Sequence, residues 1–358
     1  KLLVINPGST STKIAVYENE VPRLVRSIRH TVDELSSFFH IIDQFEFRKN
    51  LVLKELEANN IPFEFDAIVG RGGLLKPIPG GVYEVNDAML DDILHAMRTH
   101  ACNLGCLIAS ELAALLPGCR AFIADPGVVD ELDEAARITG SPYARITIWH
   151  ALNQRAIARR YAAEHHTRYE ELDLIVCHLG GGISVGVHHH GKAVDVNNAL
   201  DGEGPFSPER AGTLPAGQLI DLCCSGRYTK TNLKSVSPAV PADSPFGTTD
   251  VPAIVRRIEE GDKHAGLVLD AMIYQIAKSI GAASVVLYGK IDAILLTGGM
   301  AHSDYIISRL KERISFLAPI HVYPGEDEME ALALNALGAL RGSFRYGNIN
   351  KYHSAYNQ

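Results

Sequence analysis

The chain begins with an apolar run, and the spacing of apolar residues changes within the next few positions. Residues 2–5 are uniformly apolar, which is typical of a buried strand. A polar turn rich in Gly, Ser and Thr follows, and residues 13–17 then alternate as a second strand does. Residues 18–20 turn the chain again. The pattern predicts a β-hairpin with an unusually polar tip.

The same device recurs in the middle of the chain. Residues 172–187 combine an apolar strand, His178, three glycines and a second alternating strand, so that Asn6 aligns with His178 and Gly8 with Gly180. Residues 66–73 and 292–299 each join an apolar strand to a glycine pair. This order is a weak internal duplication. It predicts two similar α/β lobes whose strand ends face one cleft.

Helical periodicity accounts for most of the remaining apolar positions. The expected helices cover about residues 31–59, 88–100, 104–116, 151–164, 249–260, 263–290, 303–315 and 329–341. Short strands are expected at 121–124 and 320–323, and a change of domain at about 145–150. Residues 197–250 are rich in Gly, Pro, Ser and Asp, and so long an irregular stretch favours a binding loop or a lid.

Composition narrows the class of protein. A chain of 358 residues suggests two ordinary domains, and the net charge of −8 argues against nucleic acid as a partner. We find no run near the roughly 20 apolar residues of a membrane span and no signal peptide, so no membrane partner is expected. The six cysteines have no zinc-site spacing, which favours reduced thiols in a cytoplasmic protein.

Several polar residues are placed where ligands bind. The hairpin tip offers hydroxyls, backbone N–H groups and Lys13, which can cradle a phosphate, although an ordinary solvated turn would look the same. Arg71 lies between glycines, and its planar fork suits a carboxylate or a phosphate unless it is a surface residue on a turn. Asp125 ends a strand or caps a helix before Pro126. The run His188-His189-His190 favours a turn of solvated imidazoles over a metal site.

Four motifs together carry a family resemblance: N-P-G-S-T-S-T-K at 6–13, R-G-G at 71–73, H-L-G-G-G at 178–182 and G-G-M at 298–300. They resemble the acetokinase family of short-chain carboxylate kinases, within the superfamily of acetate and sugar kinases, heat-shock ATPases and actin. The resemblance covers nearly the whole chain. It implies an α/β fold of two duplicated actin-like (ribonuclease H-like) domains with a cleft between them. It also implies that the last helix returns to the first lobe, which gives domains at 1–147 plus 330–358 and at 148–329.

The resemblance also implies roles for individual residues. ATP or ADP is expected at the glycine loops, with residues His178, Gly180, Gly181, Gly182, Gly298, Gly299 and Met300. Asn6 corresponds to a family residue near the transferring phosphoryl group and its Mg²⁺, surrounded by Ser9, Ser11 and Lys13. Arg71 is expected to hold the substrate carboxylate or the phosphoryl group, Asp125 to orient metal or substrate, and His150 to hydrogen-bond the phosphoryl group in flight. Glu328 is expected to hold Mg²⁺ through water, with Glu330 as its competitor.

One position departs from the family pattern. Acetate kinases carry M-G-T-R in the second lobe, and the nearest match here is residues 211–214, which places Leu214 where the arginine should be. Arg210 could supply that charge from a shifted backbone. The departure disfavours acetate and favours a longer acyl chain.

The sequence therefore predicts a kinase that phosphorylates butyrate, or a similar small carboxylate, with ATP and Mg²⁺ by direct in-line transfer. An acetate, propionate or branched-chain carboxylate kinase remains an alternative of the same class, and a sugar kinase is a third option. An ATP-gated binding protein of the heat-shock or actin kind is the alternative from another class. The family suggests a homodimer or a higher homo-oligomer.

Overall fold

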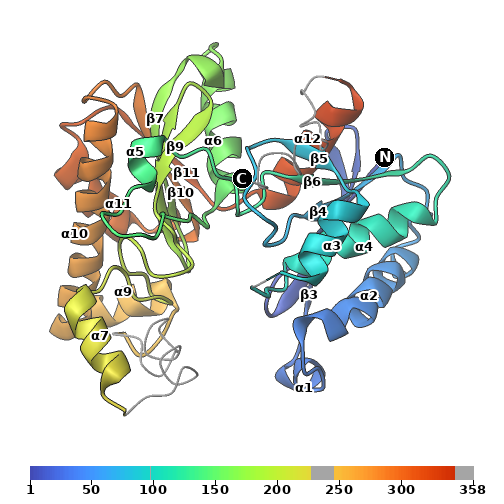
Figure 1. Cartoon of the computed structure of the whole chain (residues 1–358), viewed down its shortest axis with the longest axis horizontal. Helices are drawn as coiled ribbons and strands as arrows, with labels where there is room; N and C mark the ends of the chain where they lie inside the picture. Colours follow the sequence, from blue (N-terminus) through green and yellow to red (C-terminus); the bar gives the residue numbers. More distant parts are fainter. Residues whose placement is uncertain (97, 227–245, 343–358) are drawn as a thin grey trace. The chain divides into compact units, whose positions relative to one another are not determined.

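The computed structural model describes residues 1–96, 98–226 and 246–342, so part of the expected lid, 227–245, and the last sixteen positions, 343–358, lie outside it. The chain divides into two compact units (Figure 1). The first combines Lys1–Asp130 with the chain from Asp327 onward, and the second is Glu131–Glu326.

The first boundary between the two units lies after Asp130 and not after the expected residue 147, because residues 131–147 are bonded to the second unit. Glu131 pairs with Arg155 at 2.9 Å. Arg145 donates to Asp195 at 2.8 Å and to Glu203 at 2.7 Å. The segment has little regular structure of its own, so periodicity gave no indication of which unit it joins.

A six-stranded sheet forms the centre of the first unit, in the order β3-β2-β1-β4-β6-β5. The strands are β1 Leu2–Pro7, β2 Ser11–Glu18, β3 Val21–Arg29, β4 Ala67–Arg71, β5 Val82–Glu84 and β6 Arg120–Ala124. The expected hairpin is β1 and β2, which pair antiparallel, whereas β1, β4 and β6 run parallel.

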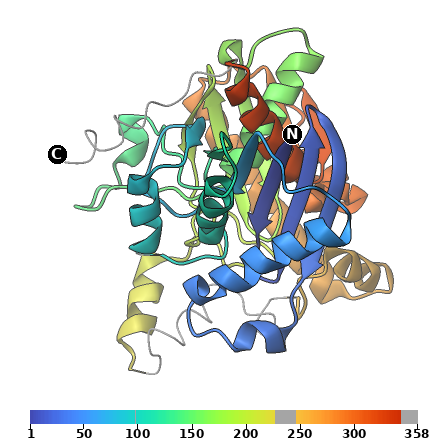
Figure 2. The same ribbon diagram turned by 90° about the vertical axis from the view of Figure 1, so that its right-hand side faces the viewer.

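Helices cover both faces of this sheet. They are α1 Val32–Ser36, α2 Phe45–Ala58, α3 Asp87–Leu94, α4 Asn103–Ala114 and α12 Glu328–Leu340, with a 3₁₀ turn η1 at Ile41–Gln44. Helices α2 and α4 bury apolar side chains against Leu3 and Ile5, and Figure 2 shows α2, in light blue, lying across the blue strands. Leu2 and Val4 point to the opposite face, where α12 packs on β1, β4 and β6.

The second unit is built on a five-stranded sheet in the order β11-β10-β7-β8-β9. Its strands are β7 Asp173–Leu179, β8 Ile183–His189, β9 Lys192–Val196, β10 Ala293–Gly298 and β11 Ile320–Pro324. The second predicted hairpin is β7 and β8. Strand β10 lies between β7 and β11 and runs parallel to both.

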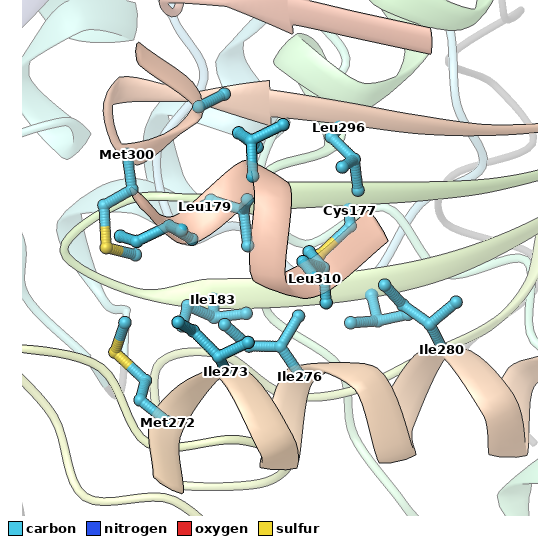
Figure 3. Close-up of a cluster of buried hydrophobic side chains, with 14 of the residues drawn as sticks. Cys177, Leu179, Ile183, Met272, Ile273, Ile276, Ile280, Leu296, Met300 and Leu310 are labelled. Atoms are coloured by element: carbon cyan, nitrogen blue, oxygen red, sulfur yellow. The ribbon is translucent and has the colours of Figure 1, made fainter. Parts of the chain in front are cut away.

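The helices of this unit lie on both sides of the sheet (Figure 1). They are α5 Glu134–Arg137, α6 Ala151–Glu164, α7 Ala216–Cys224, α9 Val251–Glu259, α10 Lys263–Val286 and α11 Asp304–Ile314, with 3₁₀ turns η2 Tyr169–Glu171 and η3 Gly299–His302. Helix α10 repeats apolar residues at helical spacing, and Ile273, Ile276 and Ile280 point at Cys177 and Leu179 (Figure 3). Across residues 1–96, 98–226 and 246–342, no helix combines the length and apolar character needed to cross a membrane.

The two sheets repeat one topology. Strands β3-β2-β1-β4-β6 of the first unit correspond in order and direction to β9-β8-β7-β10-β11 of the second. Asn6 is therefore equivalent to His178, as the sequence alignment of the two hairpins predicted. The duplication inferred from the sequence is confirmed.

Some elements differ from the prediction. The helix expected over 31–59 is broken, since the hydroxyls of Ser36 and Ser37 bond back to the carbonyls of Asp33 and Glu34 and end α1. The helix expected over 88–100 ends at Leu94. Helix α7 lies within the stretch expected to be irregular.

Gly70, in β4, allows the close approach that places the following Arg71. A methyl group at Gly70 would collide with the backbone of Gly105 in α4. Gly70→Ala should therefore lower the stability of the first unit by about 1–3 kcal/mol, seen in calorimetry as a lower unfolding temperature. The control is Gly281→Ala in α10, where a methyl group meets nothing within 4 Å and helix propensity should add up to about 1 kcal/mol. Equal unfolding temperatures for the two variants would contradict the packing argument.

Candidate active site

Three of the expected residues meet in the first unit. The amide of Asn6 donates to Glu328 Oε2 at 2.8 Å, and the Arg71 guanidinium forms an ion pair with Glu328 Oε1. Asn6 is 7% exposed and the Glu328 side chain 11%. We call Asn6, Arg71 and Glu328 the carboxylate cluster.

The strand register explains why these side chains meet. Ile5 of β1 pairs with Gly70 of β4 in a parallel ladder, so Asn6 and Arg71 follow at the same edge of the sheet. Helix α12 begins at Glu328 and brings its carboxylate to this edge. Glu330, the competitor, is exposed. The structure thus gathers Glu328, rather than Glu330, with Asn6 and Arg71.

Asp125 follows β6 at the same edge, because Arg71 pairs with Ala124. Its backbone has a φ of 38°, which is costly for a residue other than glycine. Its Oδ1 accepts a hydrogen bond from Gly81 N at 2.8 Å, and its own N–H donates to Gly81 O. Asp125 is buried, and at least one of its carboxylate oxygens holds the loop around Gly81 in place.

A buried arginine supports the polar hairpin from behind. Arg48 of α2 is completely buried and donates to Ser11 O and Thr12 Oγ1, both at 3.0 Å. Burial lowers the pKa of its guanidinium to about 10, so it remains charged at neutral pH. Ser9 lies in the exposed turn with its Oγ 3.4 Å from His100 Nε2, and Lys13 is exposed. Arg48 thus places a positive charge directly under the candidate phosphate loop.

A thiol lies beside the carboxylate cluster. Cys102 is one of six free cysteines, in agreement with the prediction of reduced thiols. Its pKa is raised to about 11 mainly by burial, with Glu328 adding to the rise and Arg71 opposing it. The group is therefore a protonated thiol at neutral pH and a weak nucleophile.

In the second unit, His178 and His150 are stacked. Their ring centroids lie 3.8 Å apart at an interplanar angle of 11°. The amide oxygen of Asn153 lies 2.7 Å from His178 Nδ1, which therefore carries a proton. His178 Nε2 lies 3.4 Å from Glu326 Oε1. The His150 ring is held at Nδ1 by Ser184 Oγ at 2.8 Å.

The glycine loop beyond His178 is in contact with a second loop. Ser207 Oγ donates to Gly181 O at 2.5 Å. A methyl group at Gly182 would collide with the Arg210 guanidinium, and one at Gly181 with the Glu209 carboxylate. Arg210 donates to Ala199 O at 3.0 Å, and its burial lowers the pKa of the guanidinium while Glu209 raises it. Arg210 thus lies at the glycine loop, whereas Leu214 is 43% exposed.

The two glycine loops of this unit share a cavity. Gly298 ends β10 with a φ of 92°, and any side chain there would collide with the Leu179 backbone. A cavity of about 660 Å³ is lined by residues that include Gly180, Gly181, Gly299 and Met300. That volume is ordinary for a small-molecule site. Four of the residues assigned to the nucleotide from sequence, namely Gly180, Gly181, Gly299 and Met300, therefore line one cavity.

The expectation for the histidine run at 188–190 is wrong for its first member. His188 is completely buried and bonded to Gln154 and Tyr169, while His189 and His190 are exposed. The reason is that His188 still belongs to β8 and points to its covered face. His189, His190 and Asp173 are near enough to share an ion, but His189 Nδ1 is bonded to Asp173 Oδ1 at 2.5 Å.

Sequence reasoning missed several polar residues of the site. They are Arg48, Asn153, Gln154, Ser184 and Glu209. One usable signal was present: His150, Asn153 and Gln154 follow one another at helical spacing on one face of α6.

The donor set of the carboxylate cluster fits Mg²⁺. The ion prefers oxygen ligands, uses only one or two carboxylates and keeps several waters. The Glu328 carboxylate is held by one hydrogen bond and one ion pair, and a carboxylate can accept further bonds. Glu328 and the amide oxygen of Asn6 could therefore hold the ion, directly or through its waters.

Comparisons with known proteins identify the family of the chain. A model of the acetokinase family matches residues 149–318. A probable butyrate kinase of Bacteroides thetaiotaomicron is 75% identical over 344 residues, covering 96% of this chain and 98% of that protein. A probable butyrate kinase of Phocaeicola vulgatus is 56% identical over 96% of this chain and 97% of that protein.

Solved structures of other proteins share this fold over nearly the whole chain. The crystal structure of Porphyromonas gingivalis acetate kinase matches with a TM-score of 0.76 at 18% identity, covering 95% of this chain and 99% of that one. At this identity the match shows a shared fold.

Proposed function

The chain belongs to the acetokinase family, and we propose that it phosphorylates butyrate with ATP, giving butanoyl phosphate and ADP. The observation that carries the choice of acid is the 75% identity over 344 residues with a probable butyrate kinase. Leu214, in place of the arginine of acetate kinases, also favours an acid longer than acetate.

The nucleotide is proposed to bind in the cavity of the second unit. Gly180, Gly181 and Gly182 can bring backbone N–H groups close to phosphate oxygens because no side chain intervenes. Gly299 and Met300 line the same cavity and are proposed to contact the adenosine. Arg210, beside Gly182, would add positive charge at the phosphates.

The reacting acid needs no general base. A carboxylate is ionised at neutral pH, so its oxygen can attack the γ-phosphoryl group directly and in line. Two anions must then be brought together, and their repulsion must be offset. Arg71 is proposed to neutralise an anion with its planar fork, and His150 to donate a hydrogen bond to the transferred phosphoryl group.

Mg²⁺ would supply further neutralisation of charge on the phosphate oxygens. Asn6 and Glu328 are the residues proposed to hold it. Ser9, Ser11 and Lys13 are proposed to surround the phosphoryl group, supported by Arg48, and Asp125 to hold the adjacent loop. Assembly into a homodimer or a higher homo-oligomer stays a prediction.

An acyl-chain series tests the proposed substrate. The acyl phosphate is trapped with hydroxylamine while acids of two to six carbons, straight and branched, are supplied with ATP and Mg²⁺. We expect kcat/KM to be highest for butyrate. A maximum at acetate would overturn the choice of acid, and ADP release that does not depend on any carboxylate would overturn the kinase itself.

A further inference from the structure

Below His150, a line of hydrogen bonds runs into the interior of the second unit. Its distances are 2.8 Å from His150 Nδ1 to Ser184 Oγ, 2.8 Å from Ser184 Oγ to Gln154 Nε2, 2.9 Å from Gln154 Oε1 to His188 Nε2, and 2.6 Å from His188 Nδ1 to Tyr169 OH. We call Ser184, Gln154, His188 and Tyr169 the His150 relay. All four are buried, and the proposed reaction gives none of them a direct role.

Strand β8 is shaped to hold this relay. Ser184, Gly186 and His188 alternate along the strand and therefore point to one face. A methyl group at Gly186 would collide with the Gln154 carboxamide, so the missing side chain makes the space in which that amide lies. The strand thus brings a hydroxyl and an imidazole to opposite ends of one carboxamide.

The carboxamide of Gln154 fixes which group donates and which accepts in each hydrogen bond of the relay. Gln154 Nε2 lies 3.0 Å from the main-chain oxygen of Ser184, and a carbonyl oxygen can only accept. The amide nitrogen must therefore face Ser184 and the amide oxygen must face His188. Since an amide oxygen also only accepts, His188 carries a proton on Nε2.

The buried end of the relay is consistent with this direction. Burial, together with the nearby charges of Arg155 and Arg159, lowers the pKa of His188 to about 3, so its ring is neutral. A neutral imidazole has one N–H, and here it lies on Nε2, which leaves Nδ1 as an acceptor. Tyr169 OH then donates to His188 Nδ1.

The other end of the relay reaches His150. Gln154 Nε2 has two hydrogens, one for the Ser184 carbonyl and one for Ser184 Oγ. Having accepted that bond, the Ser184 hydroxyl donates its own hydrogen to His150 Nδ1. An Nδ1 atom that accepts a hydrogen bond carries no proton, so in the neutral ring the proton lies on Nε2.

We propose that Tyr169, His188, Gln154 and Ser184 are positioning residues that hold His150 as its Nε2-protonated tautomer. The inference rests on the role proposed above for His150, a donor to the transferred phosphoryl group. A neutral His150 protonated on Nδ1 would present a lone pair at Nε2 and repel phosphate oxygens. The relay removes that state, so His150 is a donor whether or not the ring is charged.

The main-chain carbonyl of Ser184 selects between the two directions of the relay, since the hydroxyl of Tyr169 can either donate or accept. In the reversed direction, His188 would carry its proton on Nδ1, the Gln154 carboxamide would be turned over, and Ser184 would accept from His150 Nδ1. The repulsion between the Gln154 oxygen and the Ser184 carbonyl opposes that direction. Ser184→Ala removes the hydroxyl that donates to His150 Nδ1 and should therefore admit the Nδ1-protonated tautomer of His150.

Nitrogen-15 NMR of histidine-labelled, unliganded protein tests this directly. At pH about 8, above the usual imidazole pKa, wild-type His150 should show a protonated Nε2 and an unprotonated Nδ1, with its signals assigned from a His150→Gln variant. In Ser184→Ala, the signals should shift toward protonated Nδ1. Ser284→Ala is the matched control, because Ser284 is also a buried serine of the second unit but its hydroxyl donates to Gly281 O.

A wild-type His150 protonated on Nδ1 would overturn the proposal, as would unchanged His150 signals in folded Ser184→Ala. If that variant does not fold, the wild-type spectrum alone decides. In activity assays, Ser184→Ala should lower kcat several-fold and raise KM little. Because the NMR readout needs no substrate, a failed butyrate assay would overturn the proposed function while leaving the tautomer measurable.

Discussion

Arg71→Ala is expected to lower kcat/KM for butyrate by about 10³-fold, the loss seen when a charge that stabilises a phosphoryl transition state is removed. Arg71 lies at the carboxyl end of β4, with its guanidinium against Glu328. Without its guanidinium, the repulsion between the substrate carboxylate and the γ-phosphoryl group is less well offset. Arg71→Lys keeps the charge but not the planar fork, and should lose less activity.

The control residue is Arg120, which lies in the same sheet but at the opposite ends of the strands. Arg120 begins the neighbouring strand β6, pairs with Glu84 at 2.6 Å and is far from the strand ends that carry the candidate site. Arg120→Ala should leave kcat/KM within a few-fold of wild type. Steady-state kinetics of the three variants, each checked for folding by circular dichroism, would contradict the proposed role if Arg71→Ala matched Arg120→Ala.

The fold could be predicted because the strongest local pattern occurs twice. Each apolar strand followed by a polar, glycine-containing turn forms a hairpin, and each strand followed by two glycines joins that hairpin in a parallel ladder. The expected class, two duplicated actin-like domains, is confirmed by the equivalent sheets and by the fold shared with an acetate kinase. Segment 131–147 was expected in the first unit and lies in the second, since it is held there by ion pairs between distant residues and not by any periodic pattern.

The candidate site could be predicted where strand ends set it. Asn6 and Arg71 lie at the ends of neighbouring strands, so their proximity follows from the topology. The choice between Glu328 and Glu330 could not be made from the sequence, because two residues at one helix N-terminus are equally acidic. It depends on the face of α12 that is turned to the sheet.

Buried polar groups were the least predictable part. His188 looked solvated because two exposed histidines follow it, and only the alternation with Ser184 and Gly186 places it inside. Arg48 lies in the stretch expected to be helical, and nothing in that periodicity marks it as buried. Both are stabilised by partners from other elements, such as Gln154 for His188 and the carbonyl of Ser11 for Arg48, which no local pattern shows.

Glu328→Gln is expected to raise the Mg²⁺ concentration needed for half-maximal rate by about 10–100-fold, the usual loss when a group that supports a metal site is removed. The amide of glutamine keeps the size of the side chain but removes the negative charge that favours the ion. It also removes the charge partner of Arg71, so kcat at saturating Mg²⁺ should fall as well.

Glu330→Gln is the matched control, because it removes the same charge two residues along α12 from an exposed position. Its Mg²⁺ dependence should stay close to wild type. The rate is measured against free Mg²⁺ at fixed MgATP, so that loss of the nucleotide complex is not mistaken for loss of the site. A rightward shift in Glu330→Gln, with Glu328→Gln unchanged, would move the proposed ligand to the exposed acid and leave Glu328 as a partner of Asn6 and Arg71 alone.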